Sequence, residues 1–472
     1  MKSGLPFSSK GGDGKNKEAA ALEPALDMTL ELVELETPWT SLWIANLILL
    51  FSSIQFSLYF SSIWPYLQEL DHNVEEKKVG WLIAVFSLGR FFASPLFGFW
   101  GNRLGRITLP VCVGILIILC SNFVYAFAEV IPRQYVYEAL LVGRVICGVG
   151  AGNTSCLRAY IATAPAPRDR SRAVAFGTMA MSIGYSLGPA VQTMFGFIGY
   201  PGFVYGYFHL DLYTSAAYFE NLCCLILLIL MLTQFKETYA GYITSDHSTE
   251  KGKDATGLKL PPFDRVAALT LIWANFTLLC MFVSMETISG PHTMVMFNWT
   301  RTDAVTYNGI IFTAGAVIAL GILLAYGTMF SQIVDERLLV VGGLTGIFIA
   351  YVSSWPYWPW MHEKQLECEE AYVWCAGTPP QPLWLYLLFW MFFSFSQPTA
   401  YMAVSVLFAK ILGPRRQGTM QGILLAAGSL ARTVGPILSS LLPSILAHNR
   451  LVALQFTLND SPPTTPGTTK SR

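Results

Sequence analysis

Long apolar runs recur along this chain and limit the folds that it can adopt. Each is about as long as the α-helix of roughly twenty residues that crosses the hydrocarbon core of a bilayer. Backbone polar groups inside lipid must be satisfied within the chain, so we predict helices rather than strands. The eleven runs cover residues 42–63, 79–100, 109–128, 136–160, 173–198, 213–234, 266–290, 306–330, 338–356, 383–409 and 418–445.

The composition agrees with an all-α polytopic membrane protein. Hydrophobic residues make up 53% of the 472 residues, and charged residues only 13%, about half the share in an average soluble protein. Lys plus Arg and Asp plus Glu both number 30, so the net charge does not indicate a nucleic-acid partner. The Cys and His spacings do not resemble a metal or haem site. We expect a protein of the lipid bilayer that has no cofactor and is not an enzyme.

A polar segment at 235–264 divides the spans into six and five. We therefore expect an N-terminal six-helix bundle at 39–234, a cytoplasmic inter-bundle loop, and a C-terminal bundle of five spans at 265–445. The residues before and after the bundles, 1–38 and 446–472, are predicted to be a disordered cytoplasmic tail and a polar tail.

An internal repeat supports the two bundles. Pro167-Arg168 precedes Gly188-Pro189, and Pro414-Arg415 precedes Gly435-Pro436 with the same separation between prolines. Spans 7–11 therefore read as a second copy of spans 1–5, which leaves the twelfth span missing from a six-plus-six pattern.

Basic residues predict the orientation. The loops on the side of the N-terminal tail hold fourteen Lys and Arg, whereas the opposite loops hold five. Cytoplasmic loops carry an excess of these residues, so we expect the N-terminus in the cytoplasm.

The loop after the second span carries a family resemblance. Its residues Gly98, Asn102, Arg103, Gly105 and Arg106 resemble the Gly-x-x-x-Asp-Arg-x-Gly-Arg signature of the major facilitator superfamily of transporters, with Asn102 in place of the aspartate. In that family the aspartate helps to latch the cytoplasmic gate. An amide still accepts hydrogen bonds but has no charge, so the resemblance implies a weaker latch.

Further stretches resemble a lysosomal branch of this family. They lie at 62–71, 80–100, 150–160, 187–193, 285–294, 306–312 and 411–422. The resemblance implies a glycosylated protein of the lysosomal or late endosomal membrane that moves a small solute, such as chloride, through a central cavity.

Charged residues inside the spans are the main candidates for the transport site. At about 1.5 Å per residue, Arg90, Arg144 and Arg432 lie roughly 16, 12 and 20 Å into their spans. A guanidinium facing lipid at such depth costs on the order of 3 kcal/mol or more, so each should face protein or water. The embedded acids are fewer, mainly Glu220 and Glu286. The excess of positive charge favours an anionic passenger.

Two of these groups have an expected role and an open alternative. Arg144 lies in Leu140-x-x-x-Arg144-x-x-x-Gly148, which resembles a family motif whose arginine faces the cavity and is tied to proton coupling. The alternative is a structural pair with a neighbouring helix, for example with Glu286. Glu286 itself either exchanges protons near lysosomal pH or forms a permanent ion pair. Gln55 and Gln397 offer hydrogen bonds to a passenger or between helices.

Other motifs have structural roles. Gly184, Gly188 and Pro189 resemble the family's fifth-span hinge, and we expect these small residues to allow close packing between the bundles. Asn298 heads an Asn-Trp-Thr glycosylation motif in a lumenal loop. Cys368 and Cys375 share another lumenal loop, where we expect a disulfide.

Three functions remain open at this point. The first is a passive or proton-coupled transporter that rocks two bundles around a central site. The second is an anion channel on the same fold, and the third is a non-transporting receptor or scaffold. A carrier saturates and shows counterflow, whereas a channel gives unitary currents. An unchanged solute flux after Arg144→Ala would favour the scaffold.

Overall fold

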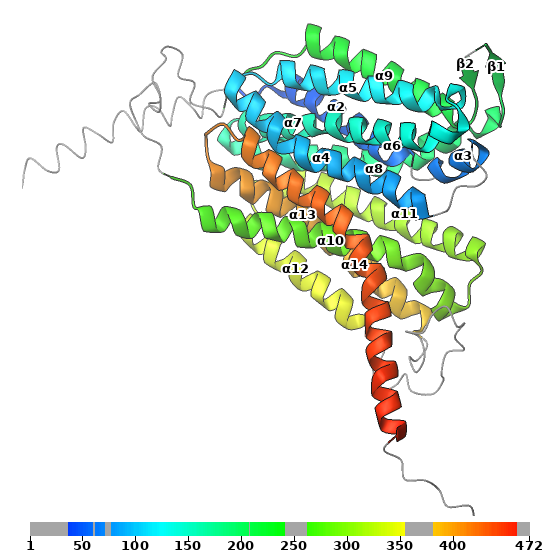
Figure 1. Cartoon of the computed structure of the whole chain (residues 1–472). Coiled ribbons are helices and arrows are strands. Elements are labelled where there is room, and N and C mark those ends of the chain that lie inside the picture. The colour runs from blue at the N-terminus through cyan, green and yellow to red at the C-terminus, as the bar shows by residue number, and fades with distance from the viewer. Residues whose placement is uncertain are drawn as a thin grey trace, which may run out of the picture.

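The computed structural model describes residues 36–59, 62–70, 77–206, 208–240, 262–354 and 381–459. These residues form two groups of helices, which we call the N-terminal half and the C-terminal half (Figure 1). The N-terminal half contains α2 (Trp39–Leu58), α3 (Ile63–Leu70), α4 (Lys77–Leu104), α5 (Thr108–Ala126), α6 (Arg133–Gly150), α7 (Thr154–Thr163), α8 (Arg170–Met194) and α9 (Thr214–Thr233). The C-terminal half contains α10 (Arg265–Phe297), α11 (Arg301–Ala325), α12 (Glu336–Ser353), α13 (Leu383–Leu412) and α14 (Gly418–Asn459).

Short elements join or extend these helices. Four are single 3-10 turns and one is a π-helical turn that continues α11, and a two-stranded antiparallel sheet lies between α8 and α9. In chain order they are η1 (Ala128–Val130), η2 (Ala151–Asn153), η3 (Pro167–Asp169), η4 (Gly196–Ile198), β1 (Phe203–Tyr205), β2 (Phe208–Leu210) and η5 (Tyr326–Phe330). The predicted all-α membrane fold is confirmed.

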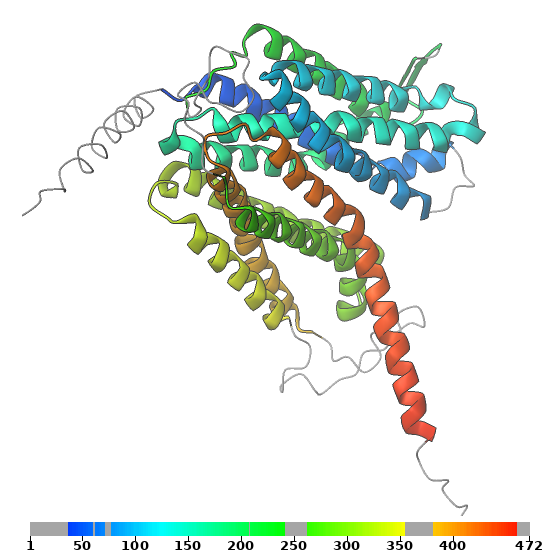
Figure 2. The ribbon, with the colours of Figure 1, turned by 60° about the vertical axis from the view of Figure 1, so that its left-hand side comes forward.

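The two halves lie side by side in both ribbon views, and α14 runs along α4 (Figures 1 and 2). Further contacts between the halves are made by α8 against α11 and by α7 against α14. Ten helices of the described chain are long and apolar enough to cross a membrane. The thirty-residue α13 occupies the position of the predicted span 383–409 but is not among the ten, because Ser394, Ser396 and Gln397 lower the mean hydropathy of its middle.

Three predicted boundaries were wrong. The span 42–63 is interrupted, since α2 ends at Leu58 and α3 starts at Ile63. The span 136–160 is built from α6, the 3-10 turn η2 and α7. The last span continues as α14 to Asn459 instead of ending near 445, because residues 446–459 contain no Pro or Gly that would stop a helix.

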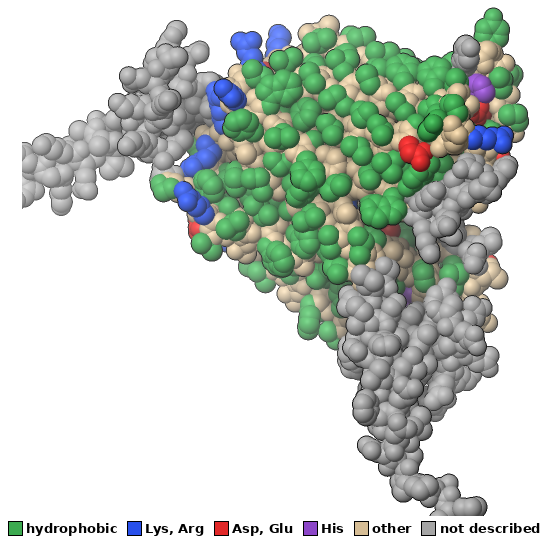
Figure 3. Space-filling view, in the orientation of Figure 1, with side chains coloured by type: hydrophobic (Ala, Val, Ile, Leu, Met, Phe, Trp, Pro, Cys, Tyr) green, Lys and Arg blue, Asp and Glu red, His purple; other side chains and the backbone are tan. Residues whose placement is uncertain are grey.

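The surface separates apolar sides from a charged end. Hydrophobic side chains cover the sides of the helices, and most of the visible Lys and Arg gather at one end (Figure 3). We call this the basic end; it contains the loops that follow α4, α7, α11 and α13 and the residues directly after α9. The opposite end carries β1 and β2 and is called the hairpin end.

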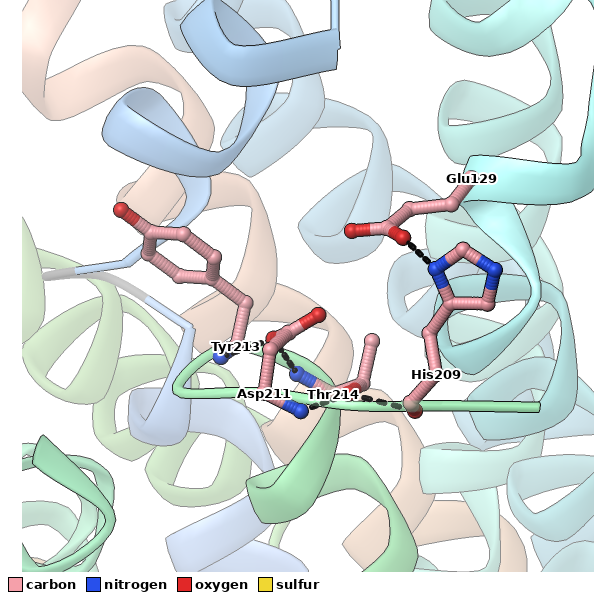
Figure 4. Close-up of polar contacts among 5 residues, drawn as sticks. All are labelled: Glu129, His209, Asp211, Tyr213 and Thr214. Atoms are coloured by element: carbon pink, nitrogen blue, oxygen red, sulfur yellow. Dashed lines mark hydrogen bonds and ion pairs between the residues drawn. The ribbon is translucent and has the colours of Figure 1, made fainter. Parts of the chain in front are cut away.

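Polar contacts attach the hairpin to the N-terminal half (Figure 4). His209 of β2 pairs with Glu129 of η1. The Asp211 carboxylate accepts hydrogen bonds from the backbone N–H groups of Tyr213 (2.6 Å) and Thr214 (2.9 Å). The carboxylate therefore satisfies free N–H groups where α9 begins.

Glycines permit the closest helix contacts. A Cβ at Gly184 would lie 2.4 Å from the Leu50 carbonyl oxygen, and one at Gly188 would lie 2.0 Å from Ser57 Oγ. Both neighbours belong to α2. These glycines therefore pack α8 within the N-terminal half, and the expected packing between the bundles was wrong.

The C-terminal half repeats this arrangement. Ser57 Oγ donates to the Gly184 carbonyl at 3.3 Å, and Ser284 Oγ donates to the Gly435 carbonyl at 3.3 Å. A Cβ on Gly435 would meet the Cys280 carbonyl oxygen of α10 at 3.3 Å. Thus α14 packs on α10 as α8 packs on α2, which agrees with the internal repeat in the sequence.

Candidate functional site

Two arginines from opposite halves meet at one tyrosine. The Arg432 guanidinium of α14 lies 4.6 Å from the ring centres of Phe56 and Tyr185, on α2 and α8. Arg90 of α4 is 7% exposed, and both guanidinium groups lie near the Tyr185 hydroxyl. We call Phe56, Arg90, Tyr185 and Arg432 the central cluster. Its members come from three helices of one half and one helix of the other.

The central cluster keeps an excess of positive charge. Glu286 of α10 is exposed and interacts electrostatically with Arg432. Among the described residues, however, neither Arg90 nor Arg432 lies within 4.0 Å of a carboxylate oxygen. Two cations and one nearby acid leave a net positive charge in the space between the halves.

Arg144 and Gln55 lie elsewhere, inside the N-terminal half. Gln55 Nε2 donates to Asn122 Oδ1 at 2.6 Å, and the Tyr59 hydroxyl donates to the same oxygen at 3.3 Å. Arg144 borders a small cavity with Gln55, Tyr59 and Asn122. The predicted set of pathway residues is therefore divided between two places. Gln397 is half-buried on α13, and no hydrogen bond of its side chain is found in the described part of the chain.

A third arginine contacts the opposite half nearer the basic end. Arg158 of α7 donates from Nη1 to the Tyr401 hydroxyl (3.2 Å) and from Nη2 to Ser405 Oγ (3.0 Å) of α13. It also lines a cavity together with Thr178 of α8 and Gln421 of α14. Arg158 thus forms a bridge between the halves.

The motif loop after α4 contacts the start of α14. Asn102 Oδ1 accepts from the Gly418 backbone N–H at 2.9 Å, and Asn102 Nδ2 donates to Thr419 Oγ1 at 3.0 Å. Arg416 Nη1 donates to the Asn102 carbonyl at 2.5 Å. Gly98 allows this approach, since a Cβ there would lie 2.1 Å from the Gly418 carbonyl oxygen. The uncharged Asn102 amide thus forms hydrogen bonds with the N-terminus of α14.

The other motif residues lie around this contact. Gly105 has a φ of +69° and lets the chain turn out of α4. Arg103 and Arg106 are exposed on the loop.

A second contact between the halves at the basic end was missed by sequence reasoning. Glu336, which opens α12, accepts hydrogen bonds from Ser171 Oγ of α8 (2.9 Å) and from the Tyr326 hydroxyl (3.1 Å). Lys410 Nζ of α13 lies 2.6 Å from the same carboxylate. The signal in the sequence was its position, because the loop before α12 in the second bundle corresponds to the loop after α4 in the first.

The remaining predicted residues lie away from these contacts. Asn298 is exposed where α10 ends and has a left-handed φ of 53°. Its exposure is compatible with glycosylation, which stays a prediction. Cys368 and Cys375 fall outside the described residues. Among the described residues, no group of three or more His, Cys, Asp or Glu side chains is placed to hold a metal ion.

Comparisons with known proteins identify related sequences. The family model described as Major Facilitator Superfamily matches residues 45–363. Major facilitator superfamily domain-containing protein 8 of Xenopus laevis is 32% identical over 87% of this chain and 88% of its own length. Major facilitator superfamily domain-containing protein 10 of Mus musculus is 23% identical over 76% of this chain and 72% of its own length.

Solved transporters share the fold. The human organic anion transporter MFSD10 (TETRAN) matches with a TM-score of 0.61 at 19% identity, over 86% of this chain and 93% of that one. The proton:xylose symporter XylE bound to 6-bromo-6-deoxy-D-glucose matches with a TM-score of 0.61 at 16% identity, over 88% and 90%. The family model, the Xenopus relative and the two helical halves agree, and the chain therefore belongs to the major facilitator superfamily.

Proposed function

We propose that this chain is a carrier that moves a small anion, such as chloride, across an endolysosomal membrane. The observation that supports it most is the central cluster. Arg90 and Arg432 come from opposite halves and converge on Tyr185, and neither forms an ion pair within the described residues. Arg90 is buried and Arg432 is half-buried, and two cations held together with one nearby acid attract an anion from solution.

The position of the cluster favours a carrier over a channel. A group held jointly by both halves binds its passenger in one arrangement and loses half of its ligands when the halves rock apart. In the described state both contacts at the basic end, at Asn102 and at Glu336, join the halves. Toward the hairpin end, Ser186 and Leu187 of α8 are exposed. This arrangement supports closure at the basic end.

Glu286 is the group that we assign to proton coupling. Its carboxylate is exposed and close enough to Arg432 to interact with it electrostatically. An anion beside Arg432 makes the local electrostatic potential more negative, and this favours protonation of a neighbouring carboxylate. The proposal thus links proton uptake at Glu286 to anion binding at Arg432.

The anionic passenger also agrees with a structural relative, since human MFSD10, which shares this fold, is an organic anion transporter. The endolysosomal location is based on the sequence resemblance described above. The cytoplasmic N-terminus is based on the distribution of Lys and Arg between the loops.

Proteoliposomes test the proposal. Radiolabelled chloride uptake should saturate, should be accelerated by unlabelled chloride inside, and should respond to a pH gradient. The Glu286→Gln variant should keep chloride exchange but lose the response to pH. Unitary currents without counterflow would show that the protein is a channel and not a carrier. The absence of chloride flux in the wild type would refute the proposal.

A further inference from the structure

A buried arginine in the N-terminal half lacks a counter-charge. The Arg144 side chain lies on α6 and is 4% exposed. Its Nε donates to the Leu82 carbonyl at 3.4 Å, whereas Nη1 and Nη2 have no hydrogen-bond partner in the described structure. The rings of Phe86 and Tyr59 lie 4.9 and 5.5 Å from the guanidinium carbon. The guanidinium therefore has two unused donor groups in an apolar setting.

No described carboxylate balances this charge. Arginine stays protonated in proteins, so the charge cannot be removed by loss of a proton. The buried Glu220 on α9 interacts electrostatically with Tyr59 and Cys147, and so does Arg144. It forms no ion pair with Arg144, however, and its own Oε2 has no partner among the described residues. An isolated buried cation is among the most costly features of a membrane interior, so a further group is required.

A space for that group is present beside Arg144, and its lining is partly polar and partly apolar. A small cavity beside Arg144 is lined by Gln55, Tyr59, Ser121, Asn122 and Cys147. The Tyr59 hydroxyl and the Gln55 amide already donate to Asn122 Oδ1, and Ser121 Oγ donates to the Gly143 carbonyl. The donors left for an anion are the two free groups of Arg144, the second N–H of the Asn122 amide and the Cys147 thiol. The cavity has room for about one water-sized particle, so a polyatomic organic anion is excluded. A chloride ion is somewhat larger than water and requires only a slight movement of the lining side chains.

We propose that Arg144 and this cavity form a structural binding site for one small monovalent anion, chloride in the first instance, inside the N-terminal half. The site is separate from the central cluster, because its lining comes from α2, from Tyr59 directly after it, and from α5 and α6. It does not depend on the transport proposal. Its anion would act as a fixed counter-ion that stabilises the half rather than as the passenger.

Thermal unfolding of the purified full chain in detergent tests the site. The background is the Arg90→Gln, Arg432→Gln double variant, in which chloride cannot stabilise the protein through the central cluster. Replacing gluconate by chloride should still raise its Tm, by about 2–4 °C at saturation. Adding Arg144→Gln should abolish the rise, and Arg144→Lys should keep part of it. A rise that persists in the Arg144→Gln protein would overturn the proposal.

Bromide keeps the test decisive if the Arg144→Gln protein does not fold. Crystals of the wild-type chain soaked in bromide should show an anomalous peak next to the Arg144 guanidinium. Density there without anomalous signal would mean that water alone fills the cavity and would overturn the proposal. Because neither measurement uses transport, a protein without chloride flux can still confirm this site, and a transporting protein can still refute it.

Discussion

The contact between Gly98 and Gly418 gives a prediction whose size can be worked out from the structure. An alanine Cβ at position 98 would lie 2.1 Å from the Gly418 carbonyl oxygen and 2.5 Å from its carbonyl carbon. Real Cβ contacts essentially never fall below 3.0 Å. The two helices α4 and α14 must therefore separate by about 0.9 Å or more at the basic end, since packed backbone cannot absorb the overlap.

That separation breaks the polar contact beside it. The hydrogen bonds of Asn102 to the Gly418 N–H and to Thr419 Oγ1, now 2.9 and 3.0 Å long, would stretch beyond hydrogen-bonding distance. Two lost bonds at about 1 kcal/mol each weaken closure by about 2 kcal/mol. Since about 1.4 kcal/mol changes an equilibrium constant tenfold, Gly98→Ala should lower the ratio of closed to open molecules by about 30-fold.

Double electron–electron resonance measures this ratio. Spin labels are attached through non-natural amino acids at Leu104 and Leu338, which are 45% and 69% exposed near the basic ends of α4 and α12. The variant should gain a population at longer distance. Gly80→Ala is the matched control, because a Cβ at Gly80 on the same helix meets nothing within 4 Å. Identical distance distributions for Gly98→Ala and wild type would refute the assignment of this contact as the closing one.

Three further predictions concern stability, each measured by thermal unfolding in detergent. Lys410→Met leaves the Glu336 carboxylate with only hydroxyl donors and should cost about 1 kcal/mol, because Lys410 is partly exposed and screened; adding Glu336→Gln should recover most of the loss, and additive losses would contradict the pairing. Gly188→Ala should cost about 1–3 kcal/mol through its overlap with Ser57 Oγ, and Ser57→Ala in the same chain should restore part, unless the overlap is not the cause. Burial raises the pKa of Tyr66 well above its usual range, so its neutral form stabilises the fold, and that contribution is lost as pH rises above about 10. Tyr66→Phe should therefore flatten the alkaline loss of stability; it should also raise the stability by about 1 kcal/mol, since the buried hydroxyl has no hydrogen-bond partner among the described residues. An unchanged alkaline profile would argue against this role.

The sequence predicted the helices well because lipid leaves few alternatives. Length and hydropathy are sufficient to place a spanning helix, and the repeated Gly-Pro pairs at 188–189 and 435–436 correctly paired α8 with α14. Depth along a span also follows from residue counting. The alternative that Arg144 forms an ion pair was left open, and no ion pair of Arg90, Arg144 or Arg432 is found among the described residues.

Direction around a helix could not be predicted in the same way. A span that is apolar on all sides gives no indication of which face meets the other half. Arg90 and Arg144 both lie deep in spans, yet the first reaches Tyr185 between the halves, whereas the second lies inside the N-terminal half against α4 and α5. The rotation of each helix is set by its neighbours, here through the glycines that fix α8 against α2.

The Glu336 contact was missed for a related reason. Its members, Ser171, Tyr326, Glu336 and Lys410, come from four separate segments. A short motif describes only one of those segments. The N-terminal counterpart was found because all of its motif residues lie in one loop, from Gly98 to Arg106.

Chloride exchange by the Arg432→Gln variant shows whether the central cluster binds the passenger. Arg432 is the cationic contribution of the C-terminal half to the cluster, and its guanidinium lies over the rings of Phe56 and Tyr185. In proteoliposomes with equal amounts of folded protein, the variant should exchange radiolabelled chloride at least about tenfold more slowly than wild type, which corresponds to about 1.4 kcal/mol of lost binding. Arg432→Lys should fall in between. Exchange at the wild-type rate without this charge would contradict the account.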